Sequence, residues 1–475
     1  MADTRRYDGM KVTVMGLGLN GGGLASTRYF ATRGAKVTVT DLRLEEVLEP
    51  TLKQLEGLDL RLVLGRHEVD DFSTADLVVK NPAVRLDNPF LKLARRVETD
   101  LTVFLSALEN PVLAVTGSKG KSTTATALYT ILKAQDPRTR LGGNITVSPL
   151  TFLEELEPGA PVILELSSWQ LADLRGRGVL RPRVAAVTNL LWDHMNAYAD
   201  QEAYASDKAE VMAGVGQEGW ALLNADQSWG SWFATRNPGR TALFSRRGKP
   251  ESLGNRVQAR FWLTPESVDG QGEWLDPHGR PRSEFLLPKE LIVPGDPFRQ
   301  NCLMAAGMAV LWGANPDLVP NALAGFPGVE HRLEKFHTWK GISFYNDTTA
   351  TIPEAATASV GSFEVPVHWI AGGTDKNLDV GALAQVPQPA SLTLLRGSAT
   401  DRMLPEFRKR GFSWNGPFGT LEEALEVVAT QARSGSVVLL SPGAASFELF
   451  KNEFDRGNSF KSLVRRRFPL EENKA

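Results

Sequence analysis

The stretch PVLAVTGSKGKST, residues 111–123, decides the fold class of this chain. Its first part, Pro111 to Val115, has the apolar and β-branched composition of a short buried strand. A glycine-rich turn follows, and a helix is predicted from Lys121 onward. A strand, a glycine-rich turn and a helix in this order predict one unit of a parallel α/β sheet, with the turn at the carboxyl edge of the sheet.

The same turn has the composition of a phosphate-binding loop. Its glycines allow backbone N–H groups to turn toward a phosphate, and the start of the following helix adds positive potential. Lys121 can reach the β- and γ-phosphates of a nucleotide, and the Ser122 hydroxyl can bind Mg²⁺. Val115 stands where the strict G-x-x-x-x-G-K-[ST] pattern has its first glycine, so the loop is a shorter variant. A second interpretation is a glycine-rich turn that binds nothing.

Upstream of this loop, strands and helices alternate over the first 100 residues. Predicted strands cover 11–15, 36–40 and 76–79, and a helix is predicted over Leu24 to Thr32. After the first strand, Gly16-Leu17-Gly18-Leu19-Asn20-Gly21 matches G-x-G-x-x-G, and Asp41 ends the second strand 20 residues later. This spacing is typical of a dinucleotide-binding domain and hence of an NAD-linked oxidoreductase. The same loop can also hold another nucleotide diphosphate, or merely pack a helix on a strand.

Downstream of the phosphate loop, further strands predict a larger central domain and a third one. Val162 to Leu166 and Val184 to Asn189 are apolar strands of the central sheet. Residues Ser245 to Pro288 are rich in Gly, Pro and Arg, and predict hairpins or a small antiparallel sheet attached to that domain. A third α/β pattern begins after about Pro327. Its predicted strands are Ile342 to Tyr345, Pro366 to Ala371, Leu392 to Arg396 and Val437 to Ser441.

Composition excludes several classes of protein. With 475 residues the chain has room for two to four domains, and its net charge of −2 provides no strong field for nucleic acid or an anionic membrane. The single Cys302 rules out a disulfide framework and a Cys-based metal site. Met1 to Met10 lacks the apolar region of a signal peptide, and no stretch approaches the ~18 apolar residues of a membrane span. We therefore expect a cytoplasmic protein that binds neither nucleic acid nor membrane. We also expect a monomer, although composition does not determine the oligomeric state.

Several motifs downstream of the phosphate loop form a recognisable set. They are Gly142-Gly143-Asn144-Ile145, Glu165-Leu166-Ser167-Ser168-Trp169-Gln170-Leu171, Thr188-Asn189, Asp193-His194-Met195-Asn196, Lys208, His331-Arg332, Asn346-Asp347 and Leu440-Ser441-Pro442. With the two glycine loops, this set resembles the Mur ligases, the ATP-dependent amino-acid ligases of peptidoglycan precursor synthesis. Within that family the chain most resembles the members that add D-glutamate to UDP-N-acetylmuramoyl-L-alanine. The pointers are the GLGL loop, ELSSWQL, DHM and the C-terminal Phe450-Lys451-Asn452 with Arg456-Gly457-Asn458.

The resemblance implies three α/β domains and a role for each. Residues 1–98 would form a Rossmann-like UDP-substrate domain, and 99–328 a central ATP-binding domain built on a P-loop-type parallel sheet with a small antiparallel addition. Residues 329–475 would form a C-terminal Rossmann-like domain for the amino acid. The implied reaction joins a carboxylate to an amine: ATP first makes an acyl phosphate, and the amine then attacks through a tetrahedral intermediate.

For ATP and metal, the resemblance assigns residues of the central and third domains. ATP would contact the loop itself, the adenine would lie near Asn301, and Arg332 and Asp347 would reach ribose or phosphates. The loop residues are Gly117, Ser118, Lys119, Gly120, Lys121, Ser122 and Thr123. Two Mg²⁺ ions are implied, and their ligands would be Ser122, Glu165, His194 and Lys208. In this family a Lys at the position of Lys208 is carbamylated by CO₂, which requires the neutral amine and yields a carboxylate-like ligand. The implied catalytic residues are Lys121, Glu165, His194 and Lys208.

For the two other substrates, the resemblance assigns residues of all three domains. Gly18, Leu19 and Asn20 would lie on the diphosphate-binding turn, Asp41 and Arg43 near the uracil, and Asn144 and Ser167 near the muramoyl part. The incoming D-glutamate would meet Thr351, Lys376 and Ser446, and the Lys376 cation would pair with a carboxylate.

Three departures from the family pattern concern the ATP and amino-acid side. Thr349 replaces a Lys, Met304 stands where many relatives have a second Asn, and Glu453 separates Lys451-Asn452 from the aromatic residue that normally follows. These departures leave open that the enzyme adds L-glutamate or a different amino acid in place of D-glutamate. Three more distant functions also stay open at this point: an NAD-linked oxidoreductase, a non-catalytic nucleotide-binding scaffold, and another ligase of the superfamily such as folylpolyglutamate synthase.

Overall fold

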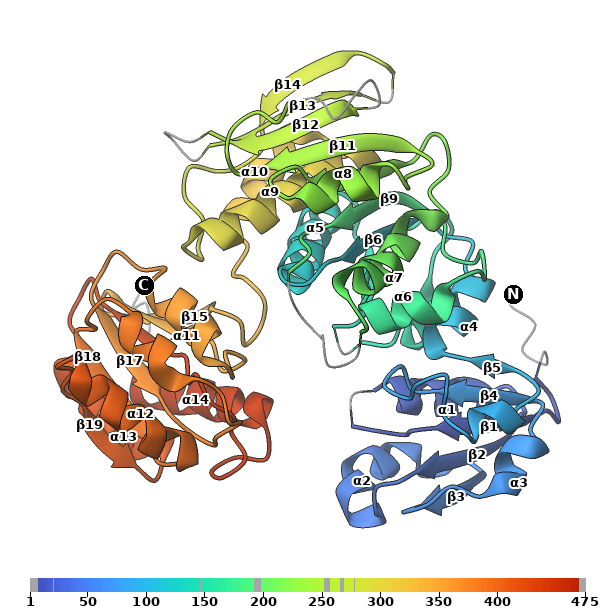
Figure 1. Cartoon of the computed structure of the whole chain (residues 1–475), viewed down its shortest axis with the longest axis horizontal. Helices are drawn as coiled ribbons and strands as arrows, with labels where there is room; N and C mark the ends of the chain where they lie inside the picture. Colours follow the sequence, from blue (N-terminus) through green and yellow to red (C-terminus); the bar gives the residue numbers. More distant parts are fainter. Residues whose placement is uncertain are drawn as a thin grey trace, which may run out of the picture. The chain divides into compact units, whose positions relative to one another are not determined.

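A computed structural model describes residues 7–19, 21–145, 147–191, 198–251, 257–264, 269–276 and 278–469. The chain divides into two compact units. The first comprises Met1–Lys289 with Gln300–Leu323, and the second comprises Glu290–Arg299 with Ala324–Ala475. The first unit contains two sheets and the second contains one (Figure 1). The division into three domains, with boundaries after residues 98 and 328, remains a prediction.

The first sheet has five parallel strands in the order β3-β2-β1-β4-β5. Its strands are β1 (Lys11–Met15), β2 (Lys36–Asp41), β3 (Leu60–Leu64), β4 (Leu77–Lys80) and β5 (Val97–Glu98). Its helices are α1 (Gly22–Ala31), α2 (Glu45–Leu52), α3 (Val69–Ser73) and α4 (Asp100–Ala107). The strand order reverses between β1 and β4, and ligands of open α/β sheets bind at such a switch point. The loop at Gly16–Gly21 and Asn81 follow these two strands.

The second sheet has nine strands in the order β14-β13-β12-β11-β10-β9-β6-β8-β7. Its strands are β6 (Val112–Thr116), β7 (Arg140–Gly143), β8 (Val162–Glu165), β9 (Pro182–Val187), β10 (Trp220–Asn224), β11 (Arg240–Ser245), β12 (Val257–Leu263), β13 (Gly270–Leu275) and β14 (Pro281–Phe285). Strands from β7 to β12 pair in parallel, and β12, β13 and β14 are antiparallel. The predicted antiparallel addition is therefore present, and it continues the central sheet because β12 pairs directly with β11.

Helices connect the strands of the central sheet or, in the case of the last two, follow its final strand. They are α5 (Lys121–Gln135), α6 (Ser168–Leu174), α7 (Gln201–Ala213), α8 (Ser228–Ala234), α9 (Asp296–Trp312) and α10 (Val319–Ala324). Helix α5 packs on β6, β7 and β8, and α7 packs on β6 and β9. The apolar cores of the first and second sheets are continuous, since one buried cluster runs from Val12 to Leu243. None of the described helices is long and apolar enough to cross a membrane.

The second unit is built on a six-stranded sheet in the order β15-β16-β20-β17-β18-β19. Its strands are β15 (Glu334–Trp339), β16 (Ile342–Asn346), β17 (Val367–Ala371), β18 (Ser391–Leu395), β19 (Asn415–Phe418) and β20 (Val437–Leu440). Its helices are α11 (Pro353–Val360), α12 (Ser398–Lys409), α13 (Leu421–Gln431) and α14 (Glu453–Arg467). Only β15 pairs antiparallel.

Neighbouring side chains of these strands enter opposite cores, which explains their continuous apolar runs. Trp369 belongs to one buried cluster and Ile370 to the other, and the same alternation holds for Leu439 and Leu440. A strand that is buried on both faces needs apolar residues at every position. The α/β fold class predicted from these runs is confirmed. The sequence did not predict β3, β5, β7, β10, β11, β15 or β19.

Candidate functional site

The glycine-rich loop after β6 is held by residues that follow β9, the neighbouring strand. The Thr188 Oγ1 donates to the Lys119 carbonyl at 2.6 Å, and the Asn189 side chain accepts from the Lys119 N–H at 3.0 Å. Gly117 has φ 144°, and a Cβ there would lie 1.9 Å from Thr188 Oγ1, so no other residue fits this close approach. The Thr-Asn motif thus fixes the shape of the predicted phosphate loop.

Two lysines predicted to be catalytic meet at the same loop carbonyl. Lys121 Nζ donates to the Gly117 and Ser118 carbonyls at 3.0 and 3.1 Å. Lys208, on α7, donates to the Gly117 carbonyl at 3.0 Å. The Lys208 side chain is only 1% exposed, and its Nζ lies 4.4 Å from the centre of the Tyr204 ring. The structure therefore brings two cationic side chains, 87 positions apart in the chain, to one point of the loop.

Glu165, the last residue of β8, is buried beside this loop. It is 1% exposed, and its Oε1 accepts a hydrogen bond from Asn144 Nδ2 at 3.1 Å. Its Oε2 is buried and has no hydrogen-bond partner among the described residues. A buried carboxylate oxygen without a donor is costly unless a cation binds it. The described residues contain no group of three His, Cys, Asp or Glu side chains arranged for a metal. His194 lies outside the described residues.

The first glycine loop uses Asp41 for its own structure. The Asp41 carboxylate is buried, and it accepts hydrogen bonds from the backbone N–H of Gly18 at 3.0 Å and of Arg43 at 2.9 Å. Asp41 is 4% exposed, so a ribose hydroxyl of a dinucleotide has little access to it. The acidic residue at the end of the second strand, which favoured an oxidoreductase, is therefore explained by its hydrogen bonds to the glycine loop. Leu19 is half exposed, and Asn20 lies outside the described residues.

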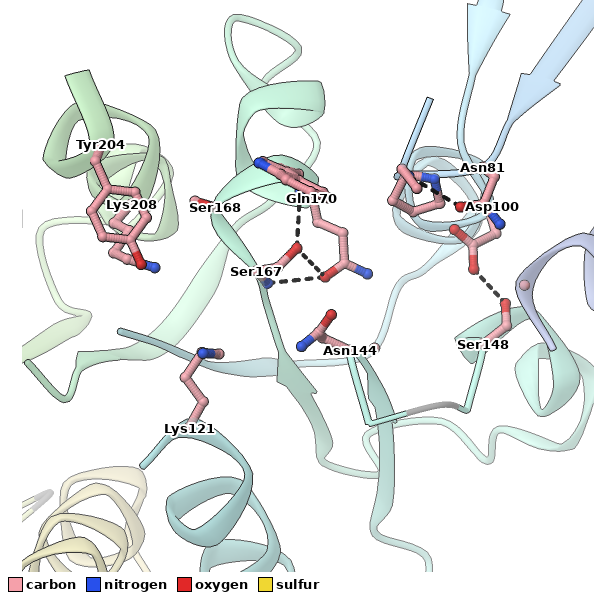
Figure 2. Close-up of a pocket in the computed structure, with 15 residues that line it drawn as sticks. Asn81, Asp100, Lys121, Asn144, Ser148, Ser167, Ser168, Gln170, Tyr204 and Lys208 are labelled. Carbon is pink, nitrogen blue, oxygen red and sulfur yellow. Dashed lines mark hydrogen bonds between the residues drawn. The ribbon is translucent and has the colours of Figure 1, made fainter. Parts of the chain in front are cut away.

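A cavity of about 380 Å³ is lined by Gly22, the first residue of α1, and by Lys121, the first residue of α5. Asp100 and Ser148 lie on one side of it, and Lys121 and Lys208 lie on the other (Figure 2). Asn144 and Ser167, both predicted substrate residues, line the space between them. The Ser167 side chain caps α6 by accepting from the Gln170 N–H.

Six further polar residues of this cavity were given no role from the sequence. They are Asn81, Asp100, Ser148, Ser168, Gln170 and Tyr204. Two signals were available: Asn81 follows a buried strand at the same sheet edge, and Ser167-x-x-Gln170 has the spacing of a capping box. Asp100 and Ser148 carried no such signal, because their hydrogen bond joins residues 48 positions apart.

Asn301 lies closer to the phosphate loop than its predicted adenine contact suggests. Its Oδ1 lies 3.5 Å from Thr124 Oγ1, and a Cβ on Gly120 would lie 2.4 Å from the same oxygen. Met304, one turn further along α9, is 1% exposed and packs in the core. The missing second Asn of the family pattern is thus replaced by an apolar packing residue.

In the second unit, three loops at the carboxyl edge of the sheet carry the remaining predicted residues. Lys376, after β17, donates from Nζ to Thr351 Oγ1 at 3.2 Å, so two predicted amino-acid contacts touch each other. The Lys376 turn is joined to the loop after β20 by an antiparallel bridge between Thr374 and Ala445. Ser446 follows this bridge and is 3% exposed.

Arg456, on α14, ties two of these loops together. It is 1% exposed, and its Nε donates to Thr348 Oγ1 at 3.0 Å. Its other nitrogens donate to the carbonyls of Thr348, Ala444 and Ala445 at 2.9 to 3.2 Å. Burial lowers the pKa of the Arg456 guanidinium to about 10. The sequence showed this residue only as part of a motif, without its role.

Around Asp347, hydrogen bonds hold the loops that follow β16 and precede β15. The Asp347 carboxylate accepts from the Leu333 N–H at 3.0 Å and from Ser441 Oγ at 2.7 Å. Arg332 is exposed, and its neighbour His331 is buried with Nδ1 2.8 Å from Asn346 Nδ2. Thr349, the departure from a family Lys, donates its hydroxyl to the His331 carbonyl at 2.8 Å. Thr349 therefore contributes to the loop structure.

Burial raises the pKa of the Asp347 carboxyl from 3.8 to about 6. The folded protein thus favours protonated Asp347, so this group stabilises the fold below its unfolded pKa and loses that contribution as the pH rises through about 6. We expect the free energy of unfolding, relative to Asp347→Asn, to fall by up to about 3 kcal/mol between about pH 4 and pH 7. Urea unfolding of the wild type and of Asp347→Asn across this pH range measures the difference in free energy. Asp401→Asn, which alters an exposed carboxylate, is the control. A difference that is constant with pH would contradict the prediction.

Two family descriptions match this chain. "Mur ligase MurD-like, N-terminal domain" matches residues 10–102, and "Mur ligase middle domain" matches residues 115–275. A UDP-N-acetylmuramoylalanine--D-glutamate ligase of Treponema pallidum is 39% identical over 96% of this chain and 98% of its own length. The chain belongs to the Mur ligase family. A Mur ligase of the same name from Roseiflexus is 37% identical over 96% of this chain and 98% of that protein.

Solved Mur ligase structures share the fold. UDP-N-acetylmuramate-alanine ligase from Thermotoga maritima has a TM-score of 0.59 at 18% identity, covering 96% of this chain and 100% of that one. MurF ligase from the same organism, in complex with ADP, has a TM-score of 0.55 at 17% identity, covering 98% of both chains. Membership of this family predicts the order of the domains along the chain, and it removes the oxidoreductase hypothesis.

Proposed function

We propose that this chain joins D-glutamate to UDP-N-acetylmuramoyl-L-alanine, with ATP converted to ADP and phosphate. The cavity that connects the start of α1 to Lys121 and Lys208 carries the proposal, because it offers one path from a diphosphate site to a phosphoryl-transfer site. The names of near-full-length relatives supply the identity of the two substrates. We further propose that the protein acts as a monomer in the cytoplasm, in cell-wall precursor synthesis and hence in cell shape and division.

The reaction begins with phosphoryl transfer to the substrate carboxylate. A carboxylate oxygen attacks the γ-phosphorus of ATP, ADP leaves, and an acyl phosphate forms. Both partners are anions, so the step needs fixed cations and donors rather than covalent help. Lys121 and the N–H groups of the loop at residues 117–123 would hold the phosphates. Asn144, anchored on Glu165, would orient the carboxylate.

Amide formation follows on the activated carbonyl. The amine nitrogen of glutamate attacks the acyl carbon, the tetrahedral intermediate expels phosphate, and the nitrogen loses a proton. Lys376, held by Thr351, would pair with a carboxylate of the incoming amino acid. Thr349 stands where the family has a Lys, and Glu453 shifts the aromatic residue by one position. Lys376 would therefore contribute more to binding the amino acid here than in relatives that keep the Lys and the aromatic residue.

Magnesium fits the chemistry of the residues at the loop. The unpartnered Oε2 of Glu165 supplies a buried anionic ligand, and the Ser122 hydroxyl lies on the adjacent helix start. We propose that Glu165, Ser122, His194 and carbamylated Lys208 hold two Mg²⁺ ions. When bound, the ions neutralise the charge that develops on the phosphoryl oxygens.

Carbamylation would change the charge of the buried Lys208 from positive to negative. We expect activity to fall when dissolved CO₂ is removed and to recover with bicarbonate, because the carbamate forms reversibly. Intact-mass analysis under native conditions should show the addition of one CO₂, and Lys208→Met should abolish it. The same mass with and without bicarbonate would contradict carbamylation.

The function is tested by an amino-acid panel. ADP and phosphate release should require both UDP-N-acetylmuramoyl-L-alanine and an amino acid, and D-glutamate should be preferred over L-glutamate and lysine. Phosphate release with another amino acid would revise the substrate and keep the ligase chemistry. Absence of release with every amino acid would refute the proposal.

A further inference from the structure

Asp100 and Ser148 lie in the cavity but have no part in the steps above. Asp100 begins α4 and is 7% exposed. Its Oδ1 accepts from the Leu101 N–H at 2.9 Å, and its Oδ2 accepts from Ser148 Oγ at 2.7 Å (Figure 2). A Cβ on Gly22 would lie 3.5 Å from Oδ2, so the carboxylate faces the first turn of α1.

This end of the cavity is the place for the substrate's diphosphate, and that assignment rests on the proposed function. The reacting carboxylate must approach Lys121, where phosphoryl transfer occurs. The diphosphate then falls at the opposite end, where Gly22 opens a ten-residue helix whose N-terminus attracts anions. Asp100 and Ser148 therefore lie at the position where an anionic group must bind.

Hydrogen-bond chemistry limits how this can happen. An ionised carboxylate and a phosphate oxygen are both acceptors only, so they cannot bond to each other. The Ser148 hydroxyl can donate one hydrogen bond, and ionised Asp100 already accepts it. With one added proton, Asp100 and Ser148 together have two donors, and one of them is left for the ligand.

Burial of Asp100 favours that proton, and the positive charge of Lys80 opposes it. Lys80 Nζ lies 2.7 Å from Asp173 Oδ2, and their side chains are 2% and 5% exposed. The positive charge of Lys80 also lowers the pKa of Asp100, so one buried ammonium interacts with two carboxylates. The nearby Arg177 is already paired with Glu98 at 2.6 Å. Burial raises the pKa of the Asp100 carboxyl, whereas its bond from Ser148 and the charge of Lys80 lower it. A bound anion would raise that pKa further.

We propose that Asp100 and Ser148 form a proton-linked site for the substrate's diphosphate, in which Asp100 takes up one proton from solvent as the diphosphate binds. The pair then donates a hydrogen bond to a phosphate oxygen. Substrate affinity therefore depends on pH through a group that takes no part in the chemical step.

Calorimetric titration of the full chain with UDP-N-acetylmuramoyl-L-alanine tests this directly. Repeating the titration at one pH in two buffers of different protonation enthalpy gives the number of protons taken up. The diphosphate diester and carboxylate of this ligand stay ionised between about pH 6 and pH 8, so uptake reports on the protein. We expect up to one proton, with affinity falling by at most about tenfold per pH unit above the pKa of the free site.

Two variants separate this proposal from a structural role. Asp100→Asn carries a permanent amide donor, so it should bind the ligand at neutral pH with no proton uptake and little pH dependence. Ser148→Ala removes the bond that lowers the pKa of Asp100, so the fall in affinity should move to higher pH. Circular dichroism confirms that each variant is folded.

The outcomes are distinct. Binding by the wild type without proton uptake, or with uptake that persists in Asp100→Asn, overturns the proton-linked site and leaves the proposed function intact. An unchanged pH profile in Ser148→Ala overturns it as well. No binding of the ligand by the wild type removes the proposed substrate, and this inference with it.

Discussion

Replacing Glu165 with Gln is expected to lower kcat about a thousandfold, because a neutral amide cannot serve as an anionic metal ligand. The substitution keeps the shape of the side chain and an oxygen for the bond from Asn144 Nδ2. What it removes is the negative charge at the buried Oε2, which has no donor in the described part of the chain. Steady-state kinetics with varied Mg²⁺ measure the effect.

The Mg²⁺ dependence separates metal binding from packing. If Glu165 holds the ion, the Mg²⁺ concentration for half-maximal activity should rise together with the loss of kcat. Glu157→Gln changes an exposed carboxylate of the same unit and should leave both values unchanged. A Glu165→Gln protein that keeps a tenth or more of wild-type kcat would show that Glu165 is not a ligand.

Replacing Arg456 with Met is expected to destabilise the second unit by about 3–5 kcal/mol, because it leaves several buried acceptors without donors. Those acceptors are the carbonyls of Thr348 and Ala444 and the Thr348 hydroxyl, whereas the Ala445 carbonyl keeps its bond from the Thr374 N–H. The loops they belong to lead to Thr351 and Ser446. The KM for the amino acid should therefore rise, while the KM for the UDP-linked substrate, which we propose the first unit binds, should stay unchanged.

Urea unfolding and the two KM values measure this prediction. Arg456→Lys should have a free energy of unfolding and a KM for the amino acid between those of the wild type and Arg456→Met. One ammonium can replace only some of the hydrogen-bond donors of the guanidinium. Arg410→Met, at an exposed position of the same unit, is the matched control. Equal rises in both KM values would mean that Arg456 acts on the whole protein rather than on the amino-acid loops.

Local sequence was sufficient for the phosphate loop and for most strands around it. β1 was predicted with its observed bounds, and β6 and β17 within one residue, because a strand buried on both faces leaves an unbroken apolar run. Glycine-rich turns directly after such strands mark the carboxyl edge of a sheet, so Gly18, Lys121 and Lys376 could be placed at that edge in advance. β3 and β15 were missed because edge strands carry mixed side chains.

The residues around the cavity could be predicted only in part. Glu165, Asn144 and Ser167 were found through a family motif, and their side chains lie close together in the structure. Which atoms of Glu165 are satisfied was not predictable, since that depends on a neighbour 21 positions away. Asp41 showed the reverse: its position was predicted, but its carboxylate turned out to bind the backbone of its own glycine loop.

The sequence by itself determined the α/β class, the order of the glycine loops and the family, because these depend on short runs and motifs. The tertiary structure alone decided which distant side chains share a buried environment. Lys80 and Asp173 are 93 positions apart, and Arg456 and Thr348 are 108 apart, yet each pair is buried in direct contact. Burial converts an ordinary charged residue into one that needs a specific partner, and only the folded chain shows which partner that is.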